Sequence, residues 1–268
     1  MKLNAQKLFL LDMDGTLYLD DDLFDGTLDF LDHIKKMGAR YMFLTNNSSK
    51  GVEKYIEKMK RLGIESTKDD YFTSTEATIW YLKKPENEKK YKGKKIYAMG
   101  TKSFREQMID AGFDIVTDVC DDIALLLVAN DQELTFKKLD DACILLGKGV
   151  DFIATNPDWV CPTWYGYVPD CGSFCEMLYK ATGKKAKFIG KPEPDMALIC
   201  MDRFGFSPEE TVIIGDRIYT DIACGVNAGC TSILVLSGET KLEDMKNYDI
   251  TPTYVFDDIR AVLNEMQK

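Results

Sequence analysis

Short apolar runs alternate with amphipathic stretches along the chain. The run Lys7–Leu11 predicts a buried strand, which ends at Asp12 and a glycine turn. A strand is also predicted over 39–44, and apolar residues at helical spacing predict helices over 28–37 and 52–62, each followed by a glycine. Strands and helices that alternate with such short connections predict an α/β fold, a doubly wound parallel sheet covered by helices.

The rest of the chain continues this alternation. Further strands are predicted over 94–99, 123–129, 152–155, 186–189, 211–214 and 232–236. Further helices are predicted over 104–111, 136–146, 195–204 and 218–228, and from Asp257 onward. We expect 1–78 and 183–268 to form one domain and 79–182 to be an inserted α/β domain.

The segment 156–172 is rich in Pro, Gly and aromatic residues, and we expect it to be a functional loop without regular structure of its own. Two sequences have the pattern of a capping box, Thr73-x-x-Glu76 and Ser173-x-x-Glu176. Each predicts the start of a helix.

The charge balance excludes several classes of partner. Of the 268 residues, 44 are acidic and 34 basic, which gives a formal net charge of −10. A general nucleic-acid or anionic-membrane binder would need a basic face, so we expect neither partner. A phosphorylated substrate would have to be attracted by a local cation. His33 is the single histidine, which disfavours His-metal sites and a Ser-His-Asp triad.

The eight cysteines contain no Cys-x-x-Cys pair, and most lie in apolar runs, which is typical of buried free thiols. Cys161, Cys171 and Cys175 are close in sequence, but their spacing is a weak metal signal. The first apolar run is interrupted by Asp12 and is too short for a signal peptide. The longest apolar run, Ile123–Ala129, is far shorter than the ~20 residues that a membrane span needs. We therefore expect a cytoplasmic protein.

The most informative motif is Asp12-Met-Asp14-Gly-Thr at the end of the first predicted strand. Ligands of open α/β sheets bind beyond the carboxyl ends of the strands, so both carboxylates are expected at the mouth of a site. Two buried carboxylates need a cation beside them to stay ionised. The alternative is an Asx-turn, since Asp-x-Asp-Gly is common in turns.

Three other predicted strands end in polar residues. Thr45, Asn46 and Asn47 follow the second strand and lead into a helix N-terminus, which suits a phosphoryl group. The alternative is ordinary N-capping by Ser48 or Ser49, which is compatible with that role. Lys191 follows a strand between Gly190 and a proline. Asp216 follows another strand, and Asp221 lies in the helix after it. Asp216 with Asp12 forms a set of hard oxygen ligands that suits Mg²⁺.

These four strand ends, in this order, resemble the motifs of the haloacid dehalogenase (HAD) superfamily of phosphotransferases, in particular its NagD-type, p-nitrophenyl-phosphatase-like branch. The resemblance implies a HAD-like core with an inserted cap. The spacing supports the insertion, because Thr45 and Lys191 are 146 positions apart, whereas a strand-to-strand crossover needs only about 30 residues. One departure is Asp170-Cys171 after Pro169, where the branch more often has a glycine.

The resemblance also implies roles. Asp12 would be the nucleophile that forms an aspartyl-phosphate, Asp14 the general acid and base, and Lys191 a residue that fixes Asp12 and the phosphate. Mg²⁺ would be held by Asp12, the Asp14 carbonyl and Asp216, with Asp221 orienting these groups or holding a metal-bound water. Thr45, Asn46 and Asn47 would bind phosphoryl oxygens.

The substrate is expected to be a small phosphate monoester, such as a sugar phosphate, a nucleoside monophosphate or p-nitrophenyl phosphate. Asp158 and Trp164 in the 156–172 loop are candidate contacts, and the aromatic residues of that loop could either stack on the leaving group or pack the cap. A cap with an exposed apolar face could also form a homodimer.

Two other functions use the same residues. A phosphate-binding or regulatory module would need the acidic pocket, Thr45 and Lys191, but has no use for Asp14. A dehalogenase would share the nucleophile without needing Asp14 or Mg²⁺. A dinucleotide-binding dehydrogenase is excluded, because no Gly-x-Gly-x-x-Gly follows the first strand.

Overall fold

The computed structural model describes residues 3–163 and 165–268, so Trp164 lies outside the described residues. The chain forms two compact units. Unit 1 consists of Met1–Thr45, Val52–Phe72 and Lys191–Lys268, and unit 2 of Asn46–Gly51 and Thr73–Gly190. We expected the changes of domain near 78 and 182; the compact units change at 73 and 191, and a six-residue segment after Thr45 also belongs to unit 2.

Unit 1 is built on a six-stranded sheet with the order β15-β14-β13-β1-β4-β5. The pairs β1–β13, β1–β4, β13–β14 and β14–β15 are all parallel. The strands of this sheet are β1 (Leu8–Leu11), β4 (Arg40–Thr45), β5 (Tyr71–Thr73), β13 (Thr211–Gly215), β14 (Thr231–Val235) and β15 (Tyr254–Phe256). A short antiparallel hairpin, β2 (Tyr18–Leu19) and β3 (Asp22–Leu23), follows β1.

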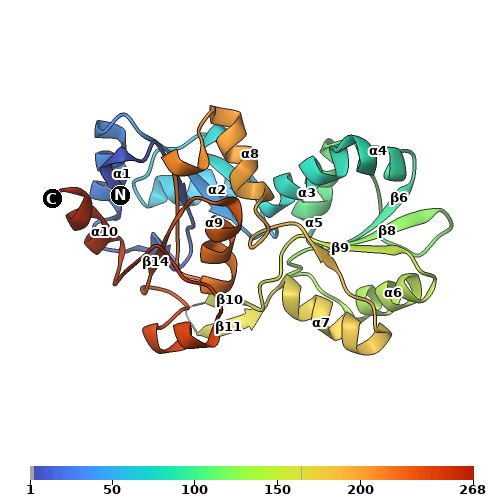
Figure 1. Cartoon of the computed structure of the whole chain (residues 1–268). Helices are drawn as coiled ribbons and strands as arrows, with labels where there is room; N and C mark the ends of the chain where they lie inside the picture. Colours follow the sequence, from blue (N-terminus) through green and yellow to red (C-terminus); the bar gives the residue numbers. More distant parts are fainter. Residues whose placement is uncertain (1–2, 164) are drawn as a thin grey trace. The chain divides into compact units, whose positions relative to one another are not determined.

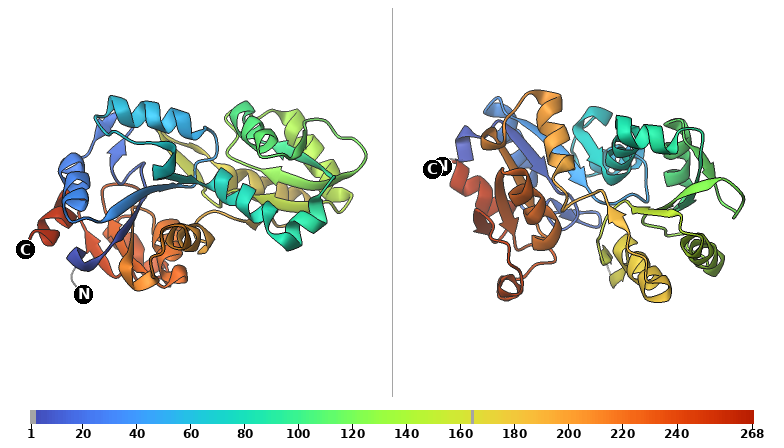
Figure 2. Two further views of the ribbon diagram at one scale, coloured as in Figure 1. Left: turned by 90° about the horizontal axis from the view of Figure 1, so that it is seen from above. Right: turned by 45° about the vertical axis from the view of Figure 1, so that its right-hand side comes forward.

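Helices cover both faces of this sheet (Figures 1 and 2). The α-helices of unit 1 are α1 (Thr27–Lys36), α2 (Val52–Arg61), α8 (Asp195–Phe204), α9 (Ala223–Ala228) and α10 (Ile259–Met266). Shorter helical turns are η1 (Leu3–Ala5), η2 (Lys68–Asp70), η3 (Pro208–Glu210), the π-helical η4 (Ile218–Ile222) and η5 (Leu242–Asn247). Phe9 and Leu11 of β1 pack with apolar residues of α1, α2 and α10, which form one core. On the other face, Gly225 of α9 lies directly against Ile213.

Unit 2 has a parallel five-stranded sheet with the order β12-β9-β8-β6-β7. Its strands are β6 (Lys95–Met99), β7 (Asp114–Val116), β8 (Ile123–Val128), β9 (Asp151–Ala154) and β12 (Lys187–Phe188). Its helices are α3 (Ser74–Lys83), α4 (Pro85–Tyr91), α5 (Lys102–Asp110), α6 (Phe136–Gly147) and α7 (Cys171–Thr182). Figures 1 and 2 show α3, α4 and α5 on one face of the sheet, and α6 and α7 on the other.

The 156–172 segment differs from the expected irregular loop. It contains an antiparallel hairpin, β10 (Val160–Thr163) and β11 (Gly166–Pro169), in which Val160 is paired with Pro169 and Thr163 with Gly166. The helix after it begins at Cys171, not at Ser173 as predicted. Asp170 caps it by accepting the Cys171 N–H, while the Ser173 hydroxyl donates to the Trp159 carbonyl.

One other local prediction is confirmed. The capping box from Thr73 to Glu76 is present at the start of α3. All eight cysteines are free thiols, and the cluster of potential metal ligands found in 3–163 and 165–268 is acidic and contains none of them. Within the described parts of the chain, no helix is both long enough and apolar enough to cross a membrane.

Candidate active site

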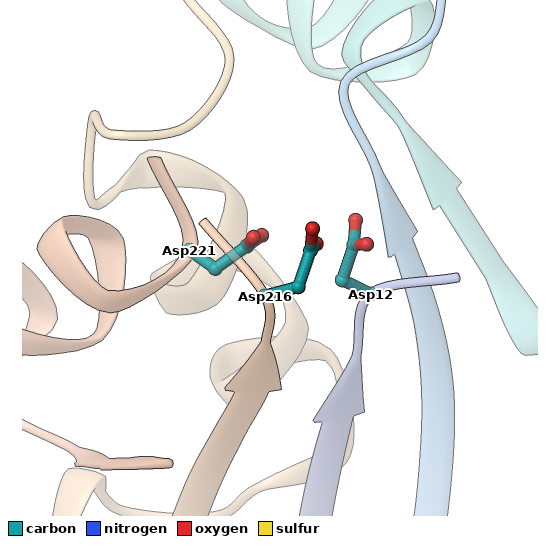
Figure 3. Close-up of side chains that lie close together, drawn as sticks. All are labelled: Asp12, Asp216 and Asp221. Carbon is teal, nitrogen blue, oxygen red and sulfur yellow. The ribbon is translucent and has the colours of Figure 1, made fainter. Parts of the chain in front are cut away.

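Two neighbouring strands of unit 1 bring carboxylates to the same edge of the sheet. Asp12 follows β1, and its N–H donates to the Ile214 carbonyl at 2.9 Å, which extends the pairing with β13 by one residue. Asp216 follows β13 directly, and Asp221 lies in η4. One carboxylate oxygen of each lies within 4.8 Å of the others. Figure 3 shows Asp12 and Asp216 at the tips of their strands with Asp221 beside them.

Lys191 supplies a buried cation to this cluster, with only 2% of its side chain exposed. Its Nζ donates to Asp12 Oδ1 at 2.7 Å, to Asp221 Oδ1 at 2.5 Å and to the Leu44 carbonyl at 2.9 Å. Burial opposes the charge, but the two carboxylates outweigh it and raise the pKa of Lys191 above its usual value. Three acceptors for three N–H donors fix the ammonium in place.

The negative charge of the cluster exceeds what this one lysine compensates. Burial raises the pKa of Asp12 well above its usual value, although Lys191 lowers it, and Asp221 raises it further. Burial also raises the pKa of Asp216 to about 7, although Arg217 lowers it. Buried carboxylates in this number require a further cation to be stable in the ionised form.

Asp216 has the geometry of a cation ligand. Its Oδ2 accepts the Glu239 N–H at 2.7 Å, whereas its Oδ1 is buried and has no hydrogen-bond partner among the described residues. A buried carboxylate oxygen without a partner is costly, and a hard divalent cation such as Mg²⁺ would remove that cost. Asp221 is held differently, since Lys191 contacts its Oδ1 and the Arg217 N–H donates to its Oδ2 at 3.1 Å. Asp221 is therefore better suited to orienting the cluster than to direct ligation.

The glycine turn after Asp12 leaves room for this arrangement. Gly15 has φ +87°, and a Cβ at this position would lie 2.6 Å from Asp216 Oδ2. Gly238 approaches the same carboxylate from the loop after β14. Side chains at either position would displace Asp216.

Asp14 lies on the turn that follows Asp12. Three residues that the sequence did not single out contact the side-chain carboxylates of Asp12 and Asp14. The Tyr18 hydroxyl donates to Asp14 Oδ2 at 3.4 Å, and Lys58 Nζ lies 3.6 Å from Asp14 Oδ1. The Thr16 hydroxyl donates to Asp12 Oδ2 at 3.4 Å. Burial, together with the Asp14 carboxylate, raises the pKa of Tyr18 well above its usual value, so its hydroxyl remains a donor.

The sequence offers a clear indication of a role at the site for two of these three residues. Thr16 and Tyr18 belong to the same short turn as the motif carboxylates. Lys58 comes from a distant helix, and its signal is weaker: it lies three positions after the buried Tyr55 and directly before the buried Met59, at the edge of the apolar face of α2.

The predicted phosphate-binding residues are divided between the units. Thr45 ends β4 in unit 1 and is buried. In unit 2, Asn46 is buried and its Nδ2 donates to Asp158 Oδ1 at 3.2 Å, so Asp158 is also engaged with a protein partner. Asn47 Oδ1 accepts the Ser49 N–H at 2.9 Å and the Ser49 hydroxyl at 2.7 Å, an Asx-turn of the kind expected where a strand leads into a helix. Trp164 is outside the described residues.

Two family models match the chain. A haloacid dehalogenase-like hydrolase model covers residues 9–114, and a HAD-hydrolase-like model covers 188–262. The acid sugar phosphatase of Staphylococcus aureus (strain MRSA252) is 32% identical over 262 residues, which are 98% of this chain and 98% of that protein. The chain belongs to the haloacid dehalogenase-like hydrolase family.

Solved structures specify the branch. The 4-nitrophenylphosphatase of Thermotoga maritima matches with a TM-score of 0.89 and 38% identity, over 99% of each chain. NagD from E. coli K-12 matches with a TM-score of 0.83 and 29% identity, over 97% of this chain and 98% of that one. These similarities confirm the predicted fold class, an α/β core with an inserted α/β cap, and the NagD-type branch. The chain is a HAD-type phosphatase.

Proposed function

We propose that this phosphatase is Mg²⁺-dependent and hydrolyses small phosphate monoesters through an aspartyl-phosphate on Asp12. The observation that carries the proposal is the Asp12–Lys191 contact of 2.7 Å inside a cluster of three carboxylates. A carboxylate fixed in this way at a strand end suits nucleophilic attack. The carboxylate of Asp14, two residues later, supplies the acid and base that a binding module would not need.

The reaction has two steps. In the first, a carboxylate oxygen of Asp12 forms a bond to phosphorus, the bond between phosphorus and the ester oxygen breaks, and Asp14 gives its proton to the leaving alcohol. In the second, Asp14 takes a proton from water as the water oxygen attacks phosphorus, which releases phosphate and restores the Asp12 carboxylate. Asp14 ends the cycle protonated, as it began.

The chain's own residues stabilise the charge that collects at phosphorus. Lys191 and Thr45 hold phosphoryl oxygens, with Asn46 and Asn47 as the further binding residues of the motif. Asp12, Asp216 and the Asp14 carbonyl would hold Mg²⁺, and Asp221 would orient Lys191 and these ligands. When bound, Mg²⁺ neutralises negative charge on the transferring group.

The relatives support a small substrate. One is named an acid sugar phosphatase and another a 4-nitrophenylphosphatase, so we propose that sugar phosphates, nucleoside monophosphates and p-nitrophenyl phosphate are hydrolysed here. Unit 2 then acts as the cap, in which Asp158 acts at the phosphate end through Asn46. Trp164 remains a proposed contact of the leaving group, as do residues of the β10–β11 hairpin. The eight free thiols support a reducing, cytoplasmic location.

The test is the Asp12→Asn variant, which keeps the shape of the side chain and removes the nucleophile. With p-nitrophenyl phosphate and Mg²⁺, we expect wild-type protein to turn over and Asp12→Asn to lose more than about 10³-fold in kcat. Acid-quenched wild-type protein should carry one phosphoryl group by mass spectrometry, and Asp12→Asn none. Turnover by Asp12→Asn at the wild-type rate would refute the mechanism, and a wild-type protein that binds phosphate without turnover would favour the regulatory module.

A further inference from the structure

Lys58 differs from its neighbours on α2 in its surroundings. Its side chain is 20% exposed, whereas that of Lys54 is 65% exposed and pairs with Glu57 on the same helix. Lys58 Nζ lies 3.8 Å from the centroid of the Tyr18 ring and 3.6 Å from Asp14 Oδ1. An ammonium held between an aromatic face and a carboxylate has a defined position, unlike most surface lysines.

Tyr18 holds the other oxygen of the same carboxylate. Its hydroxyl donates to Asp14 Oδ2, and its side chain is fully buried. The Gly15 N–H donates to the Tyr18 carbonyl at 2.8 Å, which closes the turn between Asp14 and Tyr18. Each oxygen of Asp14 therefore faces a donor, one on a rigid turn and one on a helix, and together these donors fix the plane of the carboxyl group.

We propose that Lys58, assisted by Tyr18, positions the carboxyl group of Asp14 and stabilises the carboxylate that forms when Asp14 gives its proton to the leaving oxygen. This inference rests on the proposed phosphatase mechanism and adds a positioning residue to it. Lys58 keeps its own protons throughout; the proton that moves is that of Asp14, as the ester bond breaks and the Asp12–phosphorus bond forms.

The proposal predicts an effect that depends on the leaving group. A poor leaving group such as an alkoxide needs proton donation in the transition state, whereas p-nitrophenolate leaves with little help. The value of kcat/KM reports the first phosphoryl transfer, before the aspartyl-phosphate is hydrolysed, so it isolates the step in which Asp14 is the acid.

The experiment compares kcat/KM for p-nitrophenyl phosphate, phenyl phosphate and glycerol phosphate. For Lys58→Met, which keeps the side-chain length without the charge, we expect a loss of about tenfold with glycerol phosphate and less than about threefold with p-nitrophenyl phosphate. Lys58→Arg should recover most of the loss, because it restores the cation. Tyr18→Phe should show a smaller loss with the same dependence on the leaving group.

Lys60→Met is the matched control, since Lys60 is an exposed lysine on the same helix and should leave all three rates unchanged. The proposal would be overturned by any of three results: an equal loss of kcat/KM for every ester in Lys58→Met, no recovery of kcat/KM in Lys58→Arg, or losses of kcat/KM that parallel the decrease in the thermal unfolding midpoint. Failure of wild-type protein to hydrolyse any ester would instead refute the proposed function.

Discussion

Both units bury polar side chains, but they satisfy them differently. In unit 1, Asp12 and Asp221 share the buried cation of Lys191, and Asp216 Oδ1 has no hydrogen-bond partner among the described residues. In unit 2, Asp170 is buried as well, but it accepts hydrogen bonds from Asn130, Asn156 and the Cys171 N–H.

The unit 2 network consists mostly of side-chain amides and hydroxyls that form hydrogen bonds with one another. Ser48 contacts the Thr155 hydroxyl at 2.9 Å, and that hydroxyl donates to Asn156 Oδ1 at 2.7 Å. A network of this kind fixes a single conformation of the segments it joins. The unit 1 cluster instead has spare acceptors and excess negative charge, as expected of a site completed by a ligand. Substitutions in the carboxylate cluster of unit 1 should therefore affect chemistry first, and those in the Asp170 network of unit 2 stability first.

The largest expected effect is that of metal removal, which addresses unit 1 alone. We expect exhaustive chelation to reduce phosphatase activity to background and Mg²⁺ to restore it. In the absence of substrate, Mg²⁺ should raise the thermal unfolding midpoint of the wild-type protein, because a cation that binds only the folded state stabilises it. Asp216→Asn should abolish both responses. Full activity after chelation, or an unchanged Mg²⁺-dependent shift in Asp216→Asn, would contradict the assignment of the cluster as a metal site.

Removal of the unit 1 cation should have the next largest effect. Lys191→Met should lower kcat by about 10²–10³-fold, since it removes a positive charge at the transferring phosphoryl group. It should also lower the free energy of unfolding of the metal-free protein by about 3–5 kcal/mol, because it leaves Asp12 and Asp221 without their buried partner. Steady-state kinetics and urea unfolding measure the two effects. Lys241→Met, at an exposed lysine of the same unit, is the control and should change neither.

The corresponding substitution in unit 2 should separate stability from chemistry. Asp170→Ala removes the cap of α7 and leaves the amides of Asn130 and Asn156 without this acceptor. We expect a loss of about 2–4 kcal/mol in the free energy of unfolding. Below the unfolding transition, kcat should stay within about threefold of wild type and the Mg²⁺-dependent shift should persist. Asp140→Ala, an exposed acid on α6, should be neutral. If folded Asp170→Ala lost as much kcat as Lys191→Met, the proposed difference between the two units would be wrong.

The sequence predicted unit 1 better than unit 2 for a physical reason. Asp12 and Asp216 each follow a predicted strand, and neighbouring parallel strands of one sheet end at a common edge, so local pattern alone placed them together. Lys191 follows β12, a strand of the unit 2 sheet, so its contact with Asp12 does not come from that common edge. The position of Lys58 beside Asp14 depends on how α2 packs, which no local pattern encodes.

In unit 2, the decisive features are tertiary. Asp170, and not Ser173, is the N-cap of α7, which begins at Cys171. The Ser173 hydroxyl donates to the Trp159 carbonyl and therefore does not cap the helix. The strands β10 and β11 have only four residues each, contain prolines and show no alternation of polar and apolar residues, so the sequence carried no strand signal there. The assignment of Asn46–Gly51 to unit 2 depends on hydrogen bonds to residues far along the chain, such as that of Asn46 to Asp158.

The smallest effects on kcat/KM are expected for substitutions of two residues within unit 2, Asp158 and Tyr167. Asp158 is buried and holds Asn46, whereas Tyr167 on β11 is 60% exposed. Asp158→Asn should lower kcat/KM by about fivefold for every ester, because in the proposed function Asn46 binds the phosphoryl group that all substrates share, and its displacement would weaken that contact. Tyr167→Ala should instead change the ratio of kcat/KM between a bulky sugar phosphate and p-nitrophenyl phosphate by about threefold, because in the proposed function the hairpin contacts the part of the substrate that differs. Both variants should retain the wild-type unfolding midpoint to within a few degrees. A change of ratio in Asp158→Asn would place this carboxylate at the leaving group, and a uniform loss in Tyr167→Ala would mean that the hairpin acts on closure or stability and does not select the substrate.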